Sequence, residues 1–228
     1  MRSLTLITPT GGRQQAFDLA VVWMRRQTFD GNVRWIIVND VDVDFIAPPM
    51  PENWRCEVLT PEPRWQPGEN TQARNLLAAL EIVGPDERVV MIEDDDHYSP
   101  DWLETVDQML DKAELVGETM ARYYNVSQHR FRQIENCSHS SMCSTALRGS
   151  AIGRLRAECR RKNKFIDMHL WRKHKSKHLF SGHRVVGIKG LPGRLGIGSG
   201  HHNNFRGEQD QNGAVLRLWI GADAGFYL

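Results

Sequence analysis

Four consecutive acidic residues, Glu93 to Asp96, follow a short apolar run at residues 89–92. Adjacent carboxylates repel one another, and burial beside an apolar segment raises the cost of charging them. Mn²⁺ or Mg²⁺ would relieve this repulsion, because these cations prefer oxygen ligands. Such an ion takes one or two protein carboxylates and completes its shell with water and phosphate oxygens. The cluster therefore predicts a bound metal ion and a diphosphate.

The same acids have a simpler interpretation as the flank of a helix. The pattern predicts that a helix begins at Pro100, with Ser99 as its N-cap, and negative charge near a helix N-terminus is mildly stabilising. One acid would be enough for that purpose. Four acids after a buried strand favour the metal site.

The elements that must position these acids follow an alternating pattern in the first half of the chain. Strands are predicted at 3–8, 33–40, 56–61 and 87–93, and helices at 16–27, at 70–84 and from residue 100. This order implies right-handed crossovers and a mostly parallel sheet covered by helices. Beyond residue 114 we expect antiparallel strands, two helices and a glycine-rich loop over residues 187–204. The predicted fold class is α/β with a smaller antiparallel C-terminal portion.

Polar residues occur at the carboxyl ends of three predicted strands, where open parallel sheets bind ligands. Residues 8–13 follow the first strand, Asn39 and Asp40 follow the second, and the acids follow the fourth. We therefore expect these segments to meet in one site.

Four motifs, in this order along the chain, resemble those of nucleotide-sugar-dependent glycosyltransferases of the GT-A fold, in particular the family-two-like group. The resemblance covers roughly Leu4 to Asp167. "LITPTGGR" is similar to the first strand and donor loop of that family, and "VNDVD" is similar to its second strand. "NTQARNLLAAL" resembles its Ala-Arg-Asn helix, and "IEDDDHYSPDWL" resembles its Asp-x-Asp region.

The resemblance implies transfer of a sugar from a nucleotide-diphosphate donor with the help of a divalent metal ion. Asp40 would hold the nucleotide base, Asp94 would face the ribose, and Arg74 would lie near the diphosphate. The donor loop would contribute Thr8, Thr10 and Arg13.

The alignment of the acids is ambiguous in register. Aligning on the strand end and on Pro100 makes Asp95 the principal metal ligand, whereas aligning on aspartates alone leaves Asp96 as the alternative. The glycine-rich loop "GRLGIGSGHH" would close over the donor. His201 or His202 would then supply a further metal ligand, as a late histidine does in some relatives, and His202 is the one we predict.

A later stretch, "KFIDMHLWRKH", is similar to the "EDxxLxxR" segment of inverting members of the family. Ile166 replaces its Glu, so Asp167 remains as the implied general base. The alternative is that Asp167 serves only as an N-cap of its helix.

Charge is segregated along the chain, although the net charge is only +1. Residues 148–194 contain 14 Lys or Arg against two acids. This basic segment favours a polyanionic acceptor such as nucleic acid, including modified DNA, while a glycan or a small molecule remains the other class.

Two other functions stay open at this point. A nucleotidyltransferase is one, because "TPTGGR" places glycines and a basic residue after the first strand. A non-catalytic nucleic-acid-binding protein is the other, but it leaves the acids unexplained.

The composition, with 40% hydrophobic and 25% charged residues, fits one globular domain over residues 1–228. Within it we expect residues 1–113 to bind the nucleotide sugar and residues 114–228 to bind the acceptor. The first residues do not form a signal segment, no apolar run is long enough to span a membrane, and the four cysteines form no Cys-x-x-Cys pair. We therefore expect a cytoplasmic protein.

Overall fold

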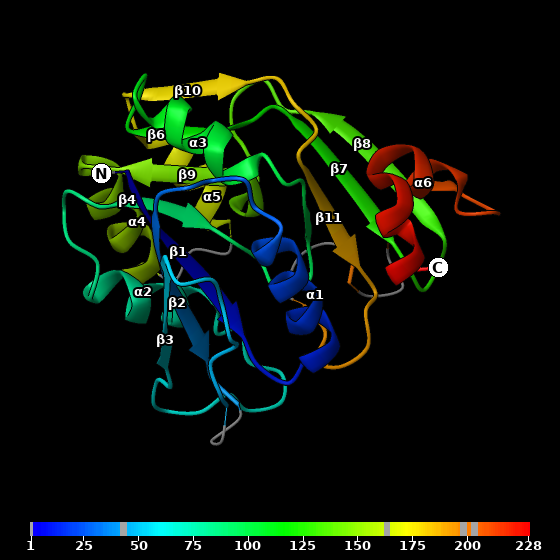
Figure 1. The fold of residues 1–228 in the computed structure, drawn as a ribbon, viewed down its shortest axis with the longest axis horizontal. Helices are drawn as coiled ribbons and strands as arrows, with labels where there is room; N and C mark the ends of the chain where they lie inside the picture. The colour runs from blue at the N-terminus through cyan, green and yellow to red at the C-terminus, as the bar shows by residue number, and fades with distance from the viewer. Residues whose placement is uncertain (1, 42–44, 162–164, 197–199, 202–204) are drawn as a thin grey trace.

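The computed structural model describes residues 2–41, 45–161, 165–196, 200–201 and 205–228. Its main element is a seven-stranded sheet of order β10-β6-β9-β4-β1-β2-β3 (Figure 1). The strands are β1 Ser3–Thr10, β2 Asn32–Asn39, β3 Trp54–Leu59, β4 Arg88–Met91, β6 Leu115–Glu118, β9 Thr145–Arg148 and β10 Lys177–Phe180.

The central strands of this sheet are parallel, as the alternating pattern predicted. β1 pairs in parallel with β2 and with β4, and β2 pairs in parallel with β3. The register places Thr10 beside Asn39 and Ile7 beside Met91, so the three carboxyl ends lie at one edge. β9 runs antiparallel between β4 and β6. The α/β fold class with a mostly parallel central sheet is therefore confirmed.

Helices cover both faces of the sheet and form one apolar core on each. β1 illustrates this, because Leu4 and Leu6 pack in one core and Ile7 packs in the other. The first core is covered by α1 Gln14–Arg25 and α3 Trp102–Leu110, and the second by α2 Gln72–Glu81, α4 Ser150–Arg160 and α5 Ile166–Lys173.

Helix α3 begins later than the sequence predicted. Its first residue is Trp102, and its N-cap is Asp101. The Ser99 hydroxyl donates a hydrogen bond of 2.7 Å to the Asp101 carboxylate instead of capping the helix.

A second sheet of order β12-β8-β7-β11-β5 lies beside the first (Figure 1). Its strands are β5 His97–Tyr98, β7 Met120–Asn125, β8 Arg130–Glu135, β11 Val185–Lys189 and β12 Glu208–Gln209. Helix α6 Ala214–Ile220 packs on β8 through Trp219 and Phe131. The β7–β8 hairpin is antiparallel, as expected.

Strand β11 departs from the sequence prediction, which placed residues 187–189 in an irregular glycine-rich loop. All five of its residues are buried, and Val186 and Ile188 belong to the first apolar core. It pairs in parallel with β7 and antiparallel with β5, the strand that follows the acids. Residues 114–228 also supply β6, β9 and β10 to the main sheet, so both halves of the chain build it. In the described part of the chain, no helix has the length and apolar character needed to cross a membrane.

Candidate functional site

The four acids occupy the short connection between β4 and β5, at the carboxyl edge of the main sheet. Asp94 and Asp96 are fully buried, and Asp95 is 3% exposed. Hydrogen bonds from two backbone amides hold the connection in place. The Ile92 amide donates to the Ile7 carbonyl at 3.0 Å, and the Glu93 amide donates to the Tyr98 hydroxyl at 2.8 Å.

The end of β1 meets this acidic turn directly, as the sheet-edge argument predicted. The Thr10 hydroxyl donates a 2.7 Å hydrogen bond to Asp94. The Arg13 guanidinium forms an ion pair with Asp94 and a second one with Asp95, the latter at 3.1 Å. Burial raises the pKa of Asp94, and the positive charge of Arg13 opposes that rise.

Asp95 faces three basic groups. Its Oδ2 lies 3.1 Å from Arg13 Nη1, 3.5 Å from His201 Nε2 and 3.9 Å from Lys189 Nζ. Burial would raise the pKa of Asp95, but Lys189 and Arg13 outweigh it and lower the pKa to about 2. Asp95 is therefore a carboxylate at any physiological pH.

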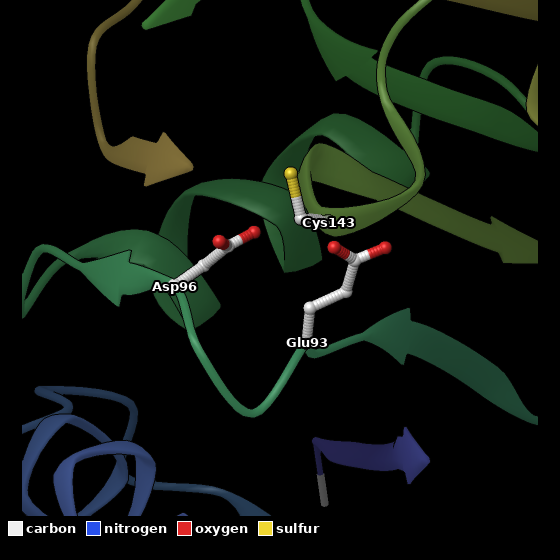
Figure 2. Close-up of side chains that lie close together, drawn as sticks. All are labelled: Glu93, Asp96 and Cys143. Carbon is white, nitrogen blue, oxygen red and sulfur yellow. The ribbon is translucent and has the colours of Figure 1, made fainter. Parts of the chain in front are cut away.

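Asp96 points toward Glu93 and Cys143 (Figure 2), and of the three bases it lies near Lys189. The ligand atoms of these three side chains lie within 4.8 Å of one another, and they are the one such group of metal-ligating side chains among the described residues. Asp96 Oδ1 accepts a 2.9 Å hydrogen bond from the Ile188 amide, whereas its buried Oδ2 has no hydrogen-bond partner in the described part of the chain. Burial raises the pKa of Glu93 to about 8 and raises that of the Cys143 thiol far above its usual value.

The structure thus gives the two candidate metal ligands different surroundings. Asp95 is ionised and lies among cations, whereas Asp96 lies against a carboxyl that stays protonated at neutral pH and a neutral thiol. Lys189 stands between them, 5% exposed, with Nζ 3.5 Å from Asp96 Oδ1. Burial lowers the pKa of Lys189, but the charges of Asp95 and Asp96 reverse that effect and raise it.

Asp40 lies at the end of β2, fully buried. Its Oδ1 accepts a 2.6 Å hydrogen bond from Arg194, and its Oδ2 accepts from the Thr71 hydroxyl and, at 2.7 Å, from Asn75 Nδ2. Next to Asn75 in α2, Arg74 has a buried Nε and Nη2 that donate no hydrogen bond to any described residue, although Glu69 lies 4.0 Å from Nη2. These donors are suited to an anionic ligand.

Two other predicted residues, Thr8 and Asp167, lie outside this arrangement. Thr8 is fully buried, and its hydroxyl accepts a 2.8 Å hydrogen bond from Trp35 Nε1 inside the core. Asp167 lies in the first turn of α5, where its Oδ1 accepts from the Met168 amide at 2.8 Å. No hydrogen bond or ion pair joins it to the acids in the described ranges. His202 falls outside the described residues, but its neighbour His201 lies beside Asp95.

Sequence reasoning missed several residues of the site: Thr71, Asn75, Cys143, Lys189 and Arg194. Lys189 and Arg194 were counted in the basic segment and in the glycine-rich loop, without a contact of their own. Other cations of that segment also have internal partners, because Arg156 donates to backbone carbonyls, Lys173 pairs with Glu158, and Arg184 pairs with Glu118. Part of the positive charge read from the sequence is therefore neutralised within the fold.

No protein-family model matches the sequence, and no curated protein matches it. Solved structures of TarS from S. aureus, a glycosyltransferase, do match the fold. The structure of TarS 1–349 aligns with a TM-score of 0.54 at 11% identity, over 82% of this chain and 60% of that chain. The fold is GT-A-like.

Related TarS structures match in the same way. The complex of TarS 1–349 with UDP gives a TM-score of 0.53, and the complex with UDP-GlcNAc gives 0.51, both at 11% identity and over 82% of this chain. A further TarS structure, at 10% identity, is covered over 37% of its length. The present chain thus spans between about one third and three fifths of the TarS chains that it matches.

The raised pKa of Glu93 predicts a pH-dependent stability. In the folded protein this carboxyl keeps its proton up to about pH 8, whereas in the unfolded chain it releases it near its ordinary pKa of 4.5. Unfolding therefore releases a proton between these values, and stability falls as the pH rises through this window. Glu93→Gln cannot lose a proton, so its melting temperature should match the wild type at pH 4, below this window, and exceed it at pH 8.

The measurement is a pair of thermal melts with a metal chelator present. A gain of ~1 kcal/mol at pH 8 corresponds to about 2–4 °C in a protein of this size. Glu52→Gln, at an exposed position, is the matched control and should show no gain. Parallel pH profiles for Glu93→Gln and the wild type would contradict the assignment of a protonated Glu93.

Proposed function

We propose that the chain is a glycosyltransferase of the family-two-like kind, which transfers a sugar from a nucleotide-diphosphate donor to an acceptor hydroxyl. The observation that carries the proposal is the meeting of Asp40, Arg13 and the acids Asp94 and Asp95 at the carboxyl edge of a GT-A-like sheet. TarS has been crystallised in complex with UDP and with UDP-GlcNAc, which supports a nucleotide sugar as the donor.

Each part of the donor has a matching group at this edge. Asp40 would accept hydrogen bonds from the base, and Asp94, held by Thr10, would face the ribose. Arg13 would offset the charge of the diphosphate. Arg74 would do so as well, because its Nε and Nη2 donate no hydrogen bond to any described residue. The leaving group would thus depart toward the guanidinium groups of Arg13 and Arg74.

The possible metal ligands around Asp95 fit a divalent ion. Asp95 Oδ2 and His201 Nε2 lie 3.5 Å apart, and a carboxylate with an imidazole is a ligand pair that Mn²⁺ accepts. Asp95 is therefore proposed as the principal ligand, with His201 and the predicted His202 from the same loop. Asp96 is the weaker candidate, because its neighbouring thiol is neutral and sulfur does not suit Mg²⁺ or Mn²⁺. When bound, such an ion supplies further positive charge to the leaving diphosphate.

Asp167 is proposed as the general base, and acceptor binding is assigned to residues 114–228, including the basic segment. A carboxylate that takes the proton of the acceptor hydroxyl allows its oxygen to attack the anomeric carbon opposite the leaving diphosphate. The product should then have the inverted anomeric configuration, which the coupling constant of its anomeric proton reports in an NMR spectrum. Retention would contradict the role of Asp167.

Donor binding can be tested by thermal melts against a panel of nucleotide sugars with different bases, nucleoside diphosphates and nucleoside triphosphates, each with and without Mn²⁺. A ligand present at 100 times its Kd stabilises the folded state by ~2.7 kcal/mol, which is a shift of several degrees. We expect a nucleotide sugar to give such a shift and Mn²⁺ to increase it. Asp95→Asn should lose the increase that depends on Mn²⁺.

Asp86→Asn is the matched control, since Asp86 is exposed on the surface and should leave the shift unchanged. A shift with nucleoside triphosphates alone would favour a nucleotidyltransferase over sugar transfer. If no nucleotide stabilises the wild type, the proposed function is wrong.

A further inference from the structure

Arg194 fills the space between an aromatic ring and the Asp40 carboxylate. Its guanidinium carbon lies 4.4 Å from the centroid of the Trp65 ring. Its Nη1 donates to Asp40 Oδ1 at 2.6 Å, and its Nη2 donates to the Thr71 hydroxyl at 2.7 Å. The side chain is only 14% exposed, so these contacts are largely shielded from water.

The groups that hold this guanidinium are those that bind a nucleotide base. A flat aromatic face stacks on a base, and a carboxylate accepts hydrogen bonds from the N–H groups at its edge. A guanidinium is also planar, stacks on aromatic rings and donates from its edge. Arg194 therefore makes the contacts that a base would make with Trp65 and Asp40.

Of the two carboxylate oxygens of Asp40, Oδ1 is the acceptor that a base could use. Its Oδ2 is already used by Thr71 and Asn75 from the start of α2. Its Oδ1 is the oxygen that Arg194 occupies. A base that stacks on Trp65 and binds Asp40 through Oδ1 must therefore take the place of the guanidinium.

We infer that Trp65 and Asp40 form the base subsite, and that the Arg194 side chain is a stand-in occupant that the base of the donor displaces. This inference rests on the proposed function and adds two residues, Trp65 and Arg194, to the donor site.

The backbone around Arg194 allows the side chain to leave without the segment leaving. The Arg194 amide donates to the Gly12 carbonyl at 2.9 Å, which ties the segment to the donor loop. This close approach needs a glycine at 193, because φ there is +105° and a Cβ would lie 2.6 Å from the Gly12 carbonyl oxygen. The main chain is thus fixed, and rotation of the side chain alone would open the subsite.

Occupation by Arg194 has a measurable consequence for affinity. When a competing internal group fills a site most of the time, the apparent affinity of the ligand falls by the fraction of molecules in which the site is open. If the site is open in about one molecule in ten, removing the competitor raises affinity about tenfold. If Arg194 instead contacted the donor directly, its removal would lower the affinity.

The test is to measure the affinity for UDP, GDP and ADP by isothermal titration calorimetry, on the full chain with Mn²⁺ present. Arg194→Met keeps the length of the side chain but removes its donors, and should bind the preferred diphosphate about tenfold more tightly than the wild type. Arg194→Lys cannot stack or form both bonds, so it should show a smaller gain, and it provides the test if the Met variant does not fold. Arg206→Ala removes an exposed arginine that is not part of the proposed subsite and should change nothing.

Trp65→Leu, combined with Arg194→Met, should cancel the gain because the base loses its stacking face. A gain that persists in this double variant would overturn the role of Trp65. Unchanged or weaker binding by both Arg194 variants would overturn the inference, while diphosphate binding by the wild type would still support the proposed function. If the folded wild type and variants bind none of the three diphosphates, the base subsite and the proposed function both fail.

Discussion

The rest of the site depends on how a buried cluster of acids is neutralised. Arg13 reaches the acids from the end of β1, and Lys189 reaches them from the end of β11 in the other sheet. Each cation is itself buried or nearly so, and a buried charge without its partner is strongly destabilising, by about 3–5 kcal/mol. The acids therefore join the two sheets at the point where ligands are expected to bind.

The same arrangement of charges gives neighbouring acids different protonation states. Asp95 lies within reach of Arg13, Lys189 and His201, and its pKa falls, whereas Glu93 is turned toward Asp96 and Cys143, and its pKa rises. Asp95 is thus ionised and able to bind a cation, including a metal ion that carries a phosphate. Glu93 and Asp96, in contrast, lie beside the buried Cys143 thiol.

The parts of this site that lie close to strand ends could be predicted from the sequence. Apolar runs followed by polar residues marked the ends of β1, β2 and β4, and parallel pairing then brought Thr10, Arg13 and Asp94 together. Thr8 was placed at the correct strand, but the sequence could not show that Trp35 would cover its hydroxyl.

Other residues depend on contacts between distant segments, which local patterns do not record. Lys189 is part of the site because β11 pairs with β5 and β7, whereas its glycine-flanked sequence favoured a loop. Arg194 meets Asp40 across 154 positions of sequence, held by a backbone bond to Gly12. Charge counting along the chain assigned both cations to a basic surface, although each one is used within the protein.

The most direct measurement is a crystal structure of the protein with Mn²⁺ and the nucleoside diphosphate that it binds best. The proposed site predicts the base against Trp65 and Asp40 with Arg194 displaced, the diphosphate beside Arg13, and the metal on Asp95. A nucleotide bound away from the carboxyl edge of the main sheet, or bound there with no contact to Asp40 and Asp95, would contradict it.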